Sequence, residues 1–210
     1  ATNGRTVTVT NGTLDLLAGL VSGFSGRLVT TGTPTVRFVT TTVQPRVTFS
    51  AGTILPDPFI VPASDSLRLL SSSFAPPTLT NNGLLLLEGN STVTTALTTG
   101  AGSTLRVRGS GIGGSPTATF TNAITNTATI DLTTQEAGYG VTLVAPSVVN
   151  QATGVIDVTA GSGGTRTLTA QLNNAGVVNL PYDLTINGAN AVHTNTGSIL
   201  LTTGDFNIVQ

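Results

Sequence analysis

Residues 150–158 read NQATGVIDV, and residues 173–180 read NNAGVVNL. In each stretch a small residue is followed by two apolar residues that lie two positions apart, with one polar residue between them. Alternate side chains of a β-strand point to opposite sides, so the two apolar residues face the same way and the polar residue faces the other way. The pattern predicts a short strand that begins at a corner and has an apolar inner side.

The same motif recurs along the chain. Copies of it, two of them weaker, occupy residues 11–16, 65–69, 82–87, 103–107, 128–132, 154–158, 176–180 and 197–201. From Asp65 onward, successive small residues lie 18 to 26 residues apart, a spacing typical of solenoid coils. We therefore expect an all-β parallel β-helix, or β-solenoid, with coils of about 20–26 residues. One internal column should contain Leu85, Leu105, Ile130, Ile156, Val178 and Ile199. A β-sandwich is the alternative fold.

Composition supports an all-β fold with a core. Of the 210 residues, 41 are Thr, which favours strands, and 39% are hydrophobic, which is enough to bury a core. Only 8% are charged, and the net charge of −1 offers no electrostatic footprint for nucleic acid. The chain has no Cys, so disulfides and thiolate metal sites are excluded. Its longest apolar stretch, residues 16–24, is too short to span a membrane, and we expect no membrane insertion.

The sequence divides into two parts of unequal regularity. Residues 78–210 carry the regular coils, whereas residues 1–77 read as an irregular N-terminal part with a cap and a Pro-rich excursion. Seven of the ten prolines lie between Pro34 and Pro77, and residues 44–64 are expected to form a long loop or a lateral hairpin. Residues 13–24 are read as strand, with a short capping helix as the alternative. Asn recurs near the corners, where it suits turns and, in stacked coils, amide ladders.

The repeated Asn-x-Gly-x-Ile-Asp-Leu cadence of residues 150–158 and 173–180 resembles the β-strand-repeat surface proteins of bacteria. These include filamentous-haemagglutinin-like adhesins and autotransporter passengers. The resemblance covers about residues 78–210 well and the first third poorly. It implies a stalk, an adhesin or a surface fibre, and it carries over no catalytic residue.

A parallel β-helix also hosts enzymes that cleave polysaccharides, which need clustered carboxylates. The best candidates are Asp131 and Asp157, at the same outward position of successive coils, about 4.8 Å apart if the coils stack. Arg106 precedes them in the column and Asn179 follows, which favours a structural ion pair over a cation site or catalysis. His193, the single histidine, reads as an exposed turn residue. We expect no catalytic residue, no cofactor and no metal.

Repeated Thr-x-Thr pairs suggest a second function. If Thr94, Thr119, Thr142 and Thr167 stacked on one flat face, the chain would present ranks of hydroxyls as an ice-binding β-solenoid does. The pattern is interrupted by Arg166 and fades after Thr169. Ice binding is therefore an alternative to the structural function.

Both ends of the chain read as unguarded strands. The expected assembly edges are Thr6, Val7, Thr8 and Val9 at the start, and Phe206, Asn207, Ile208 and Val209 at the finish. Unprotected strand edges favour pairing with another strand. We expect end-to-end self-association, or continuation into the rest of a longer chain.

The first residue is Ala1 rather than Met, as in a mature protein after removal of a signal peptide or in a cloned fragment. The function expected from the sequence is a non-catalytic structural protein that is secreted or located at the cell surface. A surface or a glycan is a possible ligand, and a polysaccharide-binding or polysaccharide-cleaving β-helix is a further alternative.

Overall fold

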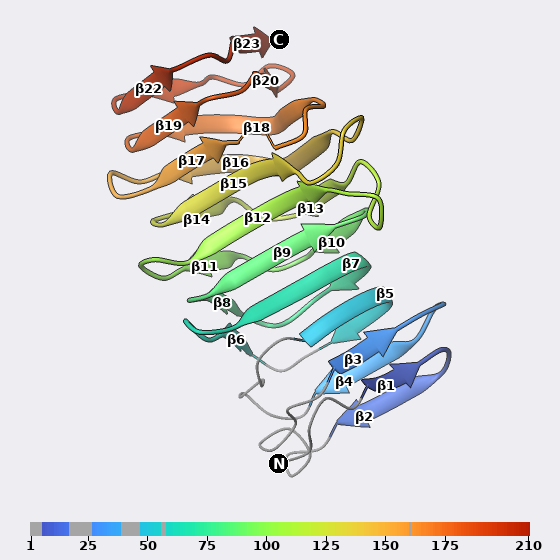
Figure 1. The fold of residues 1–210 in the computed structure, drawn as a ribbon. Coiled ribbons are helices and arrows are strands. Elements are labelled where there is room, and N and C mark those ends of the chain that lie inside the picture. Colours follow the sequence, from blue (N-terminus) through green and yellow to red (C-terminus); the bar gives the residue numbers. More distant parts are fainter. Residues whose placement is uncertain (1–5, 17–26, 39–46, 56–57, 160) are drawn as a thin grey trace.

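The computed structural model describes residues 6–16, 27–38, 47–55, 58–159 and 161–210, and these residues form a parallel β-solenoid (Figure 1). All registered pairs between named strands are parallel, and the described residues contain no helix. The predicted fold is therefore confirmed, and the β-sandwich is wrong. One turn of the solenoid, here called a rung, visits three faces in order. Figure 1 shows the rungs stacked from the N-terminal end, in blue, to the C-terminal end, in red.

Face 1 carries the repeated motif. Its strands are β1 (Thr6–Val9), β3 (Arg27–Thr30), the first half of β5 (Val47–Leu55), the first half of β7 (Ser66–Phe74), β9 (Leu84–Glu88), β12 (Thr104–Gly109), β15 (Thr129–Thr134), β17 (Val155–Val158), β19 (Val177–Leu180) and β22 (Ser198–Leu201). The expected internal column is present, because register pairs join each of its six members to the next. Leu85, Leu105 and Val178 are fully buried.

Face 2 follows face 1 in each rung. Its strands are β2 (Thr13–Leu16), β4 (Thr35–Phe38), the second halves of β5 and β7, β10 (Ser91–Val93), β13 (Thr117–Phe120), the first half of β16 (Val141–Asn150), the first half of β18 (Arg166–Asn174), β20 (Leu184–Asn187) and β23 (Phe206–Val209). The inward side of this face adds aromatic rings to the core. Phe59 of face 3 meets Phe74 of face 2 edge to face, with ring centroids 5.1 Å apart.

Face 3 closes the triangle with the shortest strands. They are β6 (Phe59–Val61), β8 (Leu79–Asn81), β11 (Leu97–Thr99), β14 (Ile124–Asn126), the second halves of β16 and β18, and β21 (Thr194–Asn195). At the corner where this face ends, the Nδ2 of Asn126 donates to Oδ1 of Asn150, Asn150 donates to Asn174, and Asn174 donates to Asn195, each over 2.7 Å. The amide ladder expected from the sequence is confirmed. It runs inside the solenoid, because Asn126, Asn150 and Asn174 are buried.

The corner between faces 1 and 2 requires a left-handed backbone. Gly89 has φ 63° there, and Ser71, at the equivalent place in the previous rung, has φ 51°. A Cβ on Gly89 would approach the Oγ of Ser71 to 2.2 Å, so the close stacking of the two rungs also requires glycine at this place. This turn lets β7 continue from face 1 to face 2 without leaving its ladder.

Two described segments within residues 44–64 form regular rungs. Within residues 44–64, β5 pairs with β7 and β6 pairs with β8, so these segments are rungs and not a lateral loop or hairpin. Proline is compatible with this placement because Pro58 and Pro62 lie outside the two strands. Of residues 13–24, which were expected to be strand with a capping helix as the alternative, residues 13–16 form strand β2 and the others lie outside the described residues.

Candidate functional surfaces

The outer side of face 1 gathers most of the charged side chains that the structure describes in strands. Glu88 is buried at the end of β9, where its Oε1 accepts hydrogen bonds from Arg108 Nε at 2.9 Å and from Ser110 Oγ at 3.0 Å. Its Oε2 lies 2.5 Å from Arg68 Nε, an ion pair without hydrogen-bond alignment. Burial alone would raise the pKa of Glu88, but the hydrogen bond and charge of Arg108, with the charge of Arg68, outweigh it and hold the pKa below its ordinary value.

Asp131 and Asp157 are register neighbours on this face, as the motif predicted. Asp131 accepts a hydrogen bond from Arg106 Nε at 2.6 Å and another from Thr159 Oγ1 at 3.0 Å. Asp157 accepts a hydrogen bond from Asn179 Nδ2 at 3.0 Å. Burial raises the pKa of Asp157, the bond from Asn179 opposes this rise, and the charge of Asp131 adds to it. The expected ion pair between Arg106 and Asp131 is confirmed, and the column is a structural network.

Metal ligands do not cluster in the described part of the chain, where no group of three or more His, Cys, Asp or Glu side chains could hold an ion. His193 is half-buried rather than exposed, and its Nδ1 accepts the backbone N–H of Leu172 at 3.0 Å.

Arg166 is a buried charged residue to which the sequence pattern assigned no position or role. Arg166 pairs with the buried Val141 of the previous rung, and the next pair along the two strands is Thr142 with Thr167, whose side chains point outward. The guanidinium of Arg166 therefore points into the solenoid, where it is almost completely buried. Its nitrogens donate to the carbonyl oxygens of Leu132, Thr159, Gly163 and Gly164, and it lies 4.8 Å from the ring centre of Tyr182. Burial lowers the pKa of Arg166. This side chain ties the glycine-rich loop 161–164 to the core.

The outer side of face 2 presents threonines in two adjacent columns, here called the threonine face. In one column, Thr117, Thr142, Thr167 and Thr185 occupy four consecutive rungs. The other column holds, in order, Thr13, Thr35, Thr53, Ser73, Thr92, Thr119, Val144 and Thr169. The members from Thr92 to Thr185 in the two columns are half-buried, as is usual for the outward residues of a sheet interior.

This register differs from the alignment that the sequence suggested. Thr119 pairs with Thr92 and Val144, whereas Thr142 pairs with Thr117 and Thr167. Thr119 therefore belongs to one column, and Thr142 and Thr167 belong to the other. Thr94 lies beyond the end of β10 and is exposed outside both columns.

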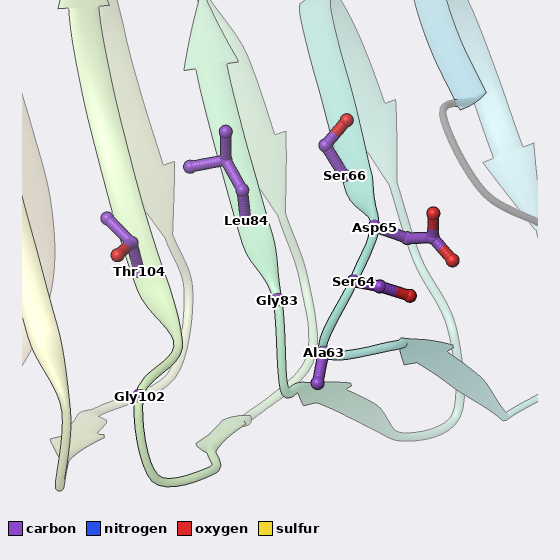
Figure 2. Close-up of a pocket in the computed structure, with 8 residues that line it drawn as sticks. All are labelled: Ala63, Ser64, Asp65, Ser66, Gly83, Leu84, Gly102 and Thr104. Carbon is purple, nitrogen blue, oxygen red and sulfur yellow. The ribbon is translucent and has the colours of Figure 1, made fainter.

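An open depression lies at the corner where β7, β9 and β12 begin (Figure 2). Its volume is about 390 Å³, and its polar groups are the hydroxyls of Ser64, Ser66 and Thr104 and the carboxylate of Asp65. Asp65 is the one titratable side chain among its eight lining residues. Such a lining supplies a single acid or base, whereas glycoside hydrolysis needs a pair of carboxyl groups.

The two ends of the stack expose strand edges and core positions. At the C-terminal end, Leu201 is 60% exposed and Ile208 is 49% exposed, although Leu180 and Ile186, their register partners in the previous rung, are fully buried. At the N-terminal end, Val7 of β1 is 42% exposed. The sequence-predicted edge strands β1 and β23 each have one described partner, β3 and β20 respectively.

Comparisons with known proteins found no family model, no curated protein and no solved structure that matches this chain. The stacked parallel strands show that the chain has the fold of a β-helix repeat protein.

Proposed function

We propose that this chain is a structural segment of an extracellular bacterial surface protein, working as a stalk, an adhesin or a fibre subunit. The observation that carries the proposal is the unbroken stacking of rungs from β5 to β23, in which each rung continues the same inward columns. A stack of this kind is an elongated rod, because each rung contacts only its neighbours along one axis. The cadence that resembles bacterial β-strand-repeat proteins supplies the Asn ladder at one corner of this stack.

The buried polar side chains support a structural role over a solvent-facing reactive site. Asn150 bonds two neighbouring rungs, Glu88 links β9 to arginines of the rungs on either side, and Arg166 holds a loop. Each of these groups is used to fix one rung against another. A surface protein exposed to variable salt gains from such internal contacts, because buried pairs are screened less than surface pairs.

Immunogold labelling of intact source cells tests the proposal. Antibodies raised against the purified 210-residue chain should decorate rods or fibres at the cell surface, and mild protease treatment of intact cells should release the labelled material. Antibodies against a cytoplasmic protein are the control for leakage. Labelling that appears only after the cells are permeabilised would overturn the proposal.

The threonine face supports a second candidate, the binding of ice. Its hydroxyls form a two-dimensional net that is interrupted at Val144. The spacing of the net is about 4.8 Å between rungs and about 6.6 Å between residues two apart on a strand. Such a net presents methyl and hydroxyl groups at regular intervals on one side of a rigid sheet. Its members in β13, β16 and β18 lie in the most continuous part of face 2.

Thermal hysteresis of the purified chain tests this candidate. Replacing Thr142 by Tyr places a large ring in the middle of the net and should abolish hysteresis if the face binds ice. Thr98→Tyr is the matched control, because Thr98 is an outward, exposed threonine of face 3. Absence of hysteresis in the unmodified chain, or equal hysteresis in both variants, would eliminate ice binding through this face.

A further inference from the structure

Asn90 lies at the corner between faces 1 and 2, in the tripeptide Asn90-Ser91-Thr92. This tripeptide has the form Asn-x-Ser/Thr, the acceptor motif for N-linked glycans in secreted proteins. The chain contains one other copy, Asn11-Gly12-Thr13. In a Thr-rich chain so short a motif gains meaning from its place in the fold. Asn90 lies within residues 58–159, which the structure describes without a gap.

The corner that carries Asn90 is short and is fixed from inside. β9 ends at Glu88 and β10 begins at Ser91, so two residues, Gly89 and Asn90, lie between the strands. The buried Ser91 donates from Oγ to the carbonyl oxygen of Glu88 at 3.2 Å and accepts the backbone N–H of Ser72, also at 3.2 Å. Asn90 itself is exposed. The turn therefore holds this one side chain at the surface.

The side-chain amide of Asn90 has its oxygen engaged and its nitrogen free. Oδ1 accepts the backbone N–H of Thr117, in the next rung, at 3.0 Å. Within the described part of the chain, Nδ2 donates no hydrogen bond. A glycan is attached through Nδ2, and the amide oxygen remains an acceptor after attachment. The contact with Thr117 is therefore compatible with a modified side chain.

Other asparagines of the described chain lack this combination. The ladder members Asn126, Asn150 and Asn174 are buried, and each donates from Nδ2 to the next asparagine. Asn122 is exposed as Asn90 is, but its Nδ2 donates to the carbonyl oxygen of Thr94 at 3.0 Å, and the second residue after it is an isoleucine. Asn90 combines the motif, an exposed position and a free amide nitrogen.

Space for a sugar is open on the N-terminal side of this corner. In the two preceding rungs β5 and β7 pass from face 1 to face 2 without a loop, and Ser71 is exposed at the equivalent turn. On the other side, the loop of residues 110–116 contacts the end of β9. A Cβ on Gly113 would approach the backbone nitrogen of Gly89 to 2.6 Å. A sugar on Asn90 can extend into solvent over the preceding rungs.

We propose that Asn90 carries an N-linked glycan in the protein made by its source cells. This inference rests on the proposed extracellular function, because the motif is an acceptor in secreted proteins. A transferase of the cell joins Nδ2 to the anomeric carbon of a phosphate-activated sugar. The bond from nitrogen to carbon forms as the bond from that carbon to the phosphate oxygen breaks. The phosphate group leaves with the electron pair, and Nδ2 gives one proton to a base of the transferase.

A glycan at this corner suits a rod with few charges. Charged residues are 8% of the chain, and an attached glycan is bulky and increases solubility. Thr92 belongs to the threonine face, so the glycan stands at the edge of that face. It would keep a flat surface, such as a neighbouring rod or an ice crystal, away from the threonines near β10.

Mass spectrometry of the chain purified from source cells tests the proposal. Trypsin cleaves after arginine, and the peptide of residues 69–106 contains Asn90. This peptide should carry an added mass equal to whole sugar residues, which fragmentation should assign to Asn90. The same chain made in a host without N-glycosylation enzymes should give the unmodified peptide. Masses are measured after digestion, so the result does not depend on the stability of any variant.

Variants expressed in the source cells identify the linkage. Thr92→Ala should abolish the added mass although Asn90 is still present, and Thr92→Ser should retain it because the motif is kept. Asn122→Gln is the matched control and should leave the peptide of residues 69–106 unchanged. Sugar that persists in Asn90→Gln would be attached to a hydroxyl and would overturn the proposal.

An unmodified peptide from the source cells would also overturn it. Failure of the glycan and failure of the proposed function are distinguishable, because surface labelling is measured independently. Surface labelling with an unmodified peptide would refute the glycan alone, whereas labelling that requires permeabilised cells would refute the extracellular function on which the glycan rests.

Discussion

Glu88 is a fully buried carboxylate held between two guanidinium groups. Replacing Glu88 by Gln keeps the shape but leaves Arg68 and Arg108 facing each other without a counter-charge. Removing one partner of a buried pair commonly costs about 3 kcal/mol, and we expect a loss of about this size in the free energy of unfolding. Urea denaturation followed by circular dichroism measures it. Glu136→Gln is the matched control, because Glu136 is exposed and is the one other glutamate, and its effect should stay within about 0.5 kcal/mol.

The same residue gives the fold an acid sensitivity with a definite sign. The pKa of Glu88 lies below its ordinary value of 4.5, so its ionised form stabilises the folded state. That contribution is fully present above about pH 4.5 and is lost as the pH falls through the lowered pKa. Asp157 acts in the opposite direction, because its raised pKa makes its ionised form unfavourable in the fold. The Glu88→Gln variant should therefore show a smaller loss of stability between pH 5 and pH 3 than the unmodified chain, and an equal loss would contradict this role.

The strand elements show which parts of the fold can be predicted from sequence. Face 1 was predictable because its motif joins a small corner residue to two apolar residues at a fixed distance, and the column from Leu85 to Ile199 follows from it. The register of face 2 was not predictable by counting, because the corner that precedes it varies. Two residues separate β9 from β10, whereas seven separate β12 from β13. Thr119 therefore pairs with Thr92 and not with Thr94.

Arg166 escaped prediction for a related reason. A lone arginine between two threonines looks like a surface residue, since buried arginines are rare. Its environment includes five carbonyl oxygens that accept hydrogen bonds from it, and four of these belong to residues shortly before it in the chain: Thr159, Gly163, Gly164 and Thr165. The sequence signal that could have located it is the run Gly161-Ser162-Gly163-Gly164. This run predicts a loop, and the backbone carbonyl oxygens of a loop have no strand partner and need another hydrogen-bond donor.

The Asn ladder joins elements of successive rungs, and its members are not equivalent. Asn150 is buried, donates to Asn174 and accepts from Asn126, so Asn150→Ala leaves polar groups on both sides without partners. We expect a loss of about 2–3 kcal/mol in the free energy of unfolding, measured by urea denaturation. Asn195→Ala removes an exposed member at the end of the ladder and should cost about 0.5 kcal/mol or less. Equal effects of the two substitutions would show that burial of the ladder contributes nothing.

On the scale of the whole molecule, stability should vary along the solenoid axis. A rung in the middle, such as the one containing β15, has a paired rung on each side, whereas β22 and β23 have a described neighbour on one side only. In a stack whose units contact only their neighbours, a terminal unit opens by breaking one interface instead of two. Local opening free energies should therefore fall from the centre toward the C-terminal rung.

Amide hydrogen exchange measures this gradient directly. At a concentration where the chain is monomeric, amides of β22 and β23 should exchange at least about tenfold faster than those of β12 to β18, because one broken rung interface costs less than two. The unmodified chain at a tenfold lower concentration should show the same gradient, and this measurement is the control for association. If raising the concentration of the unmodified chain slows exchange selectively in β22 and β23, these strands have gained a partner. Uniform exchange along the chain would instead mean that the solenoid opens as a single cooperative unit, and the rung-by-rung description would be wrong.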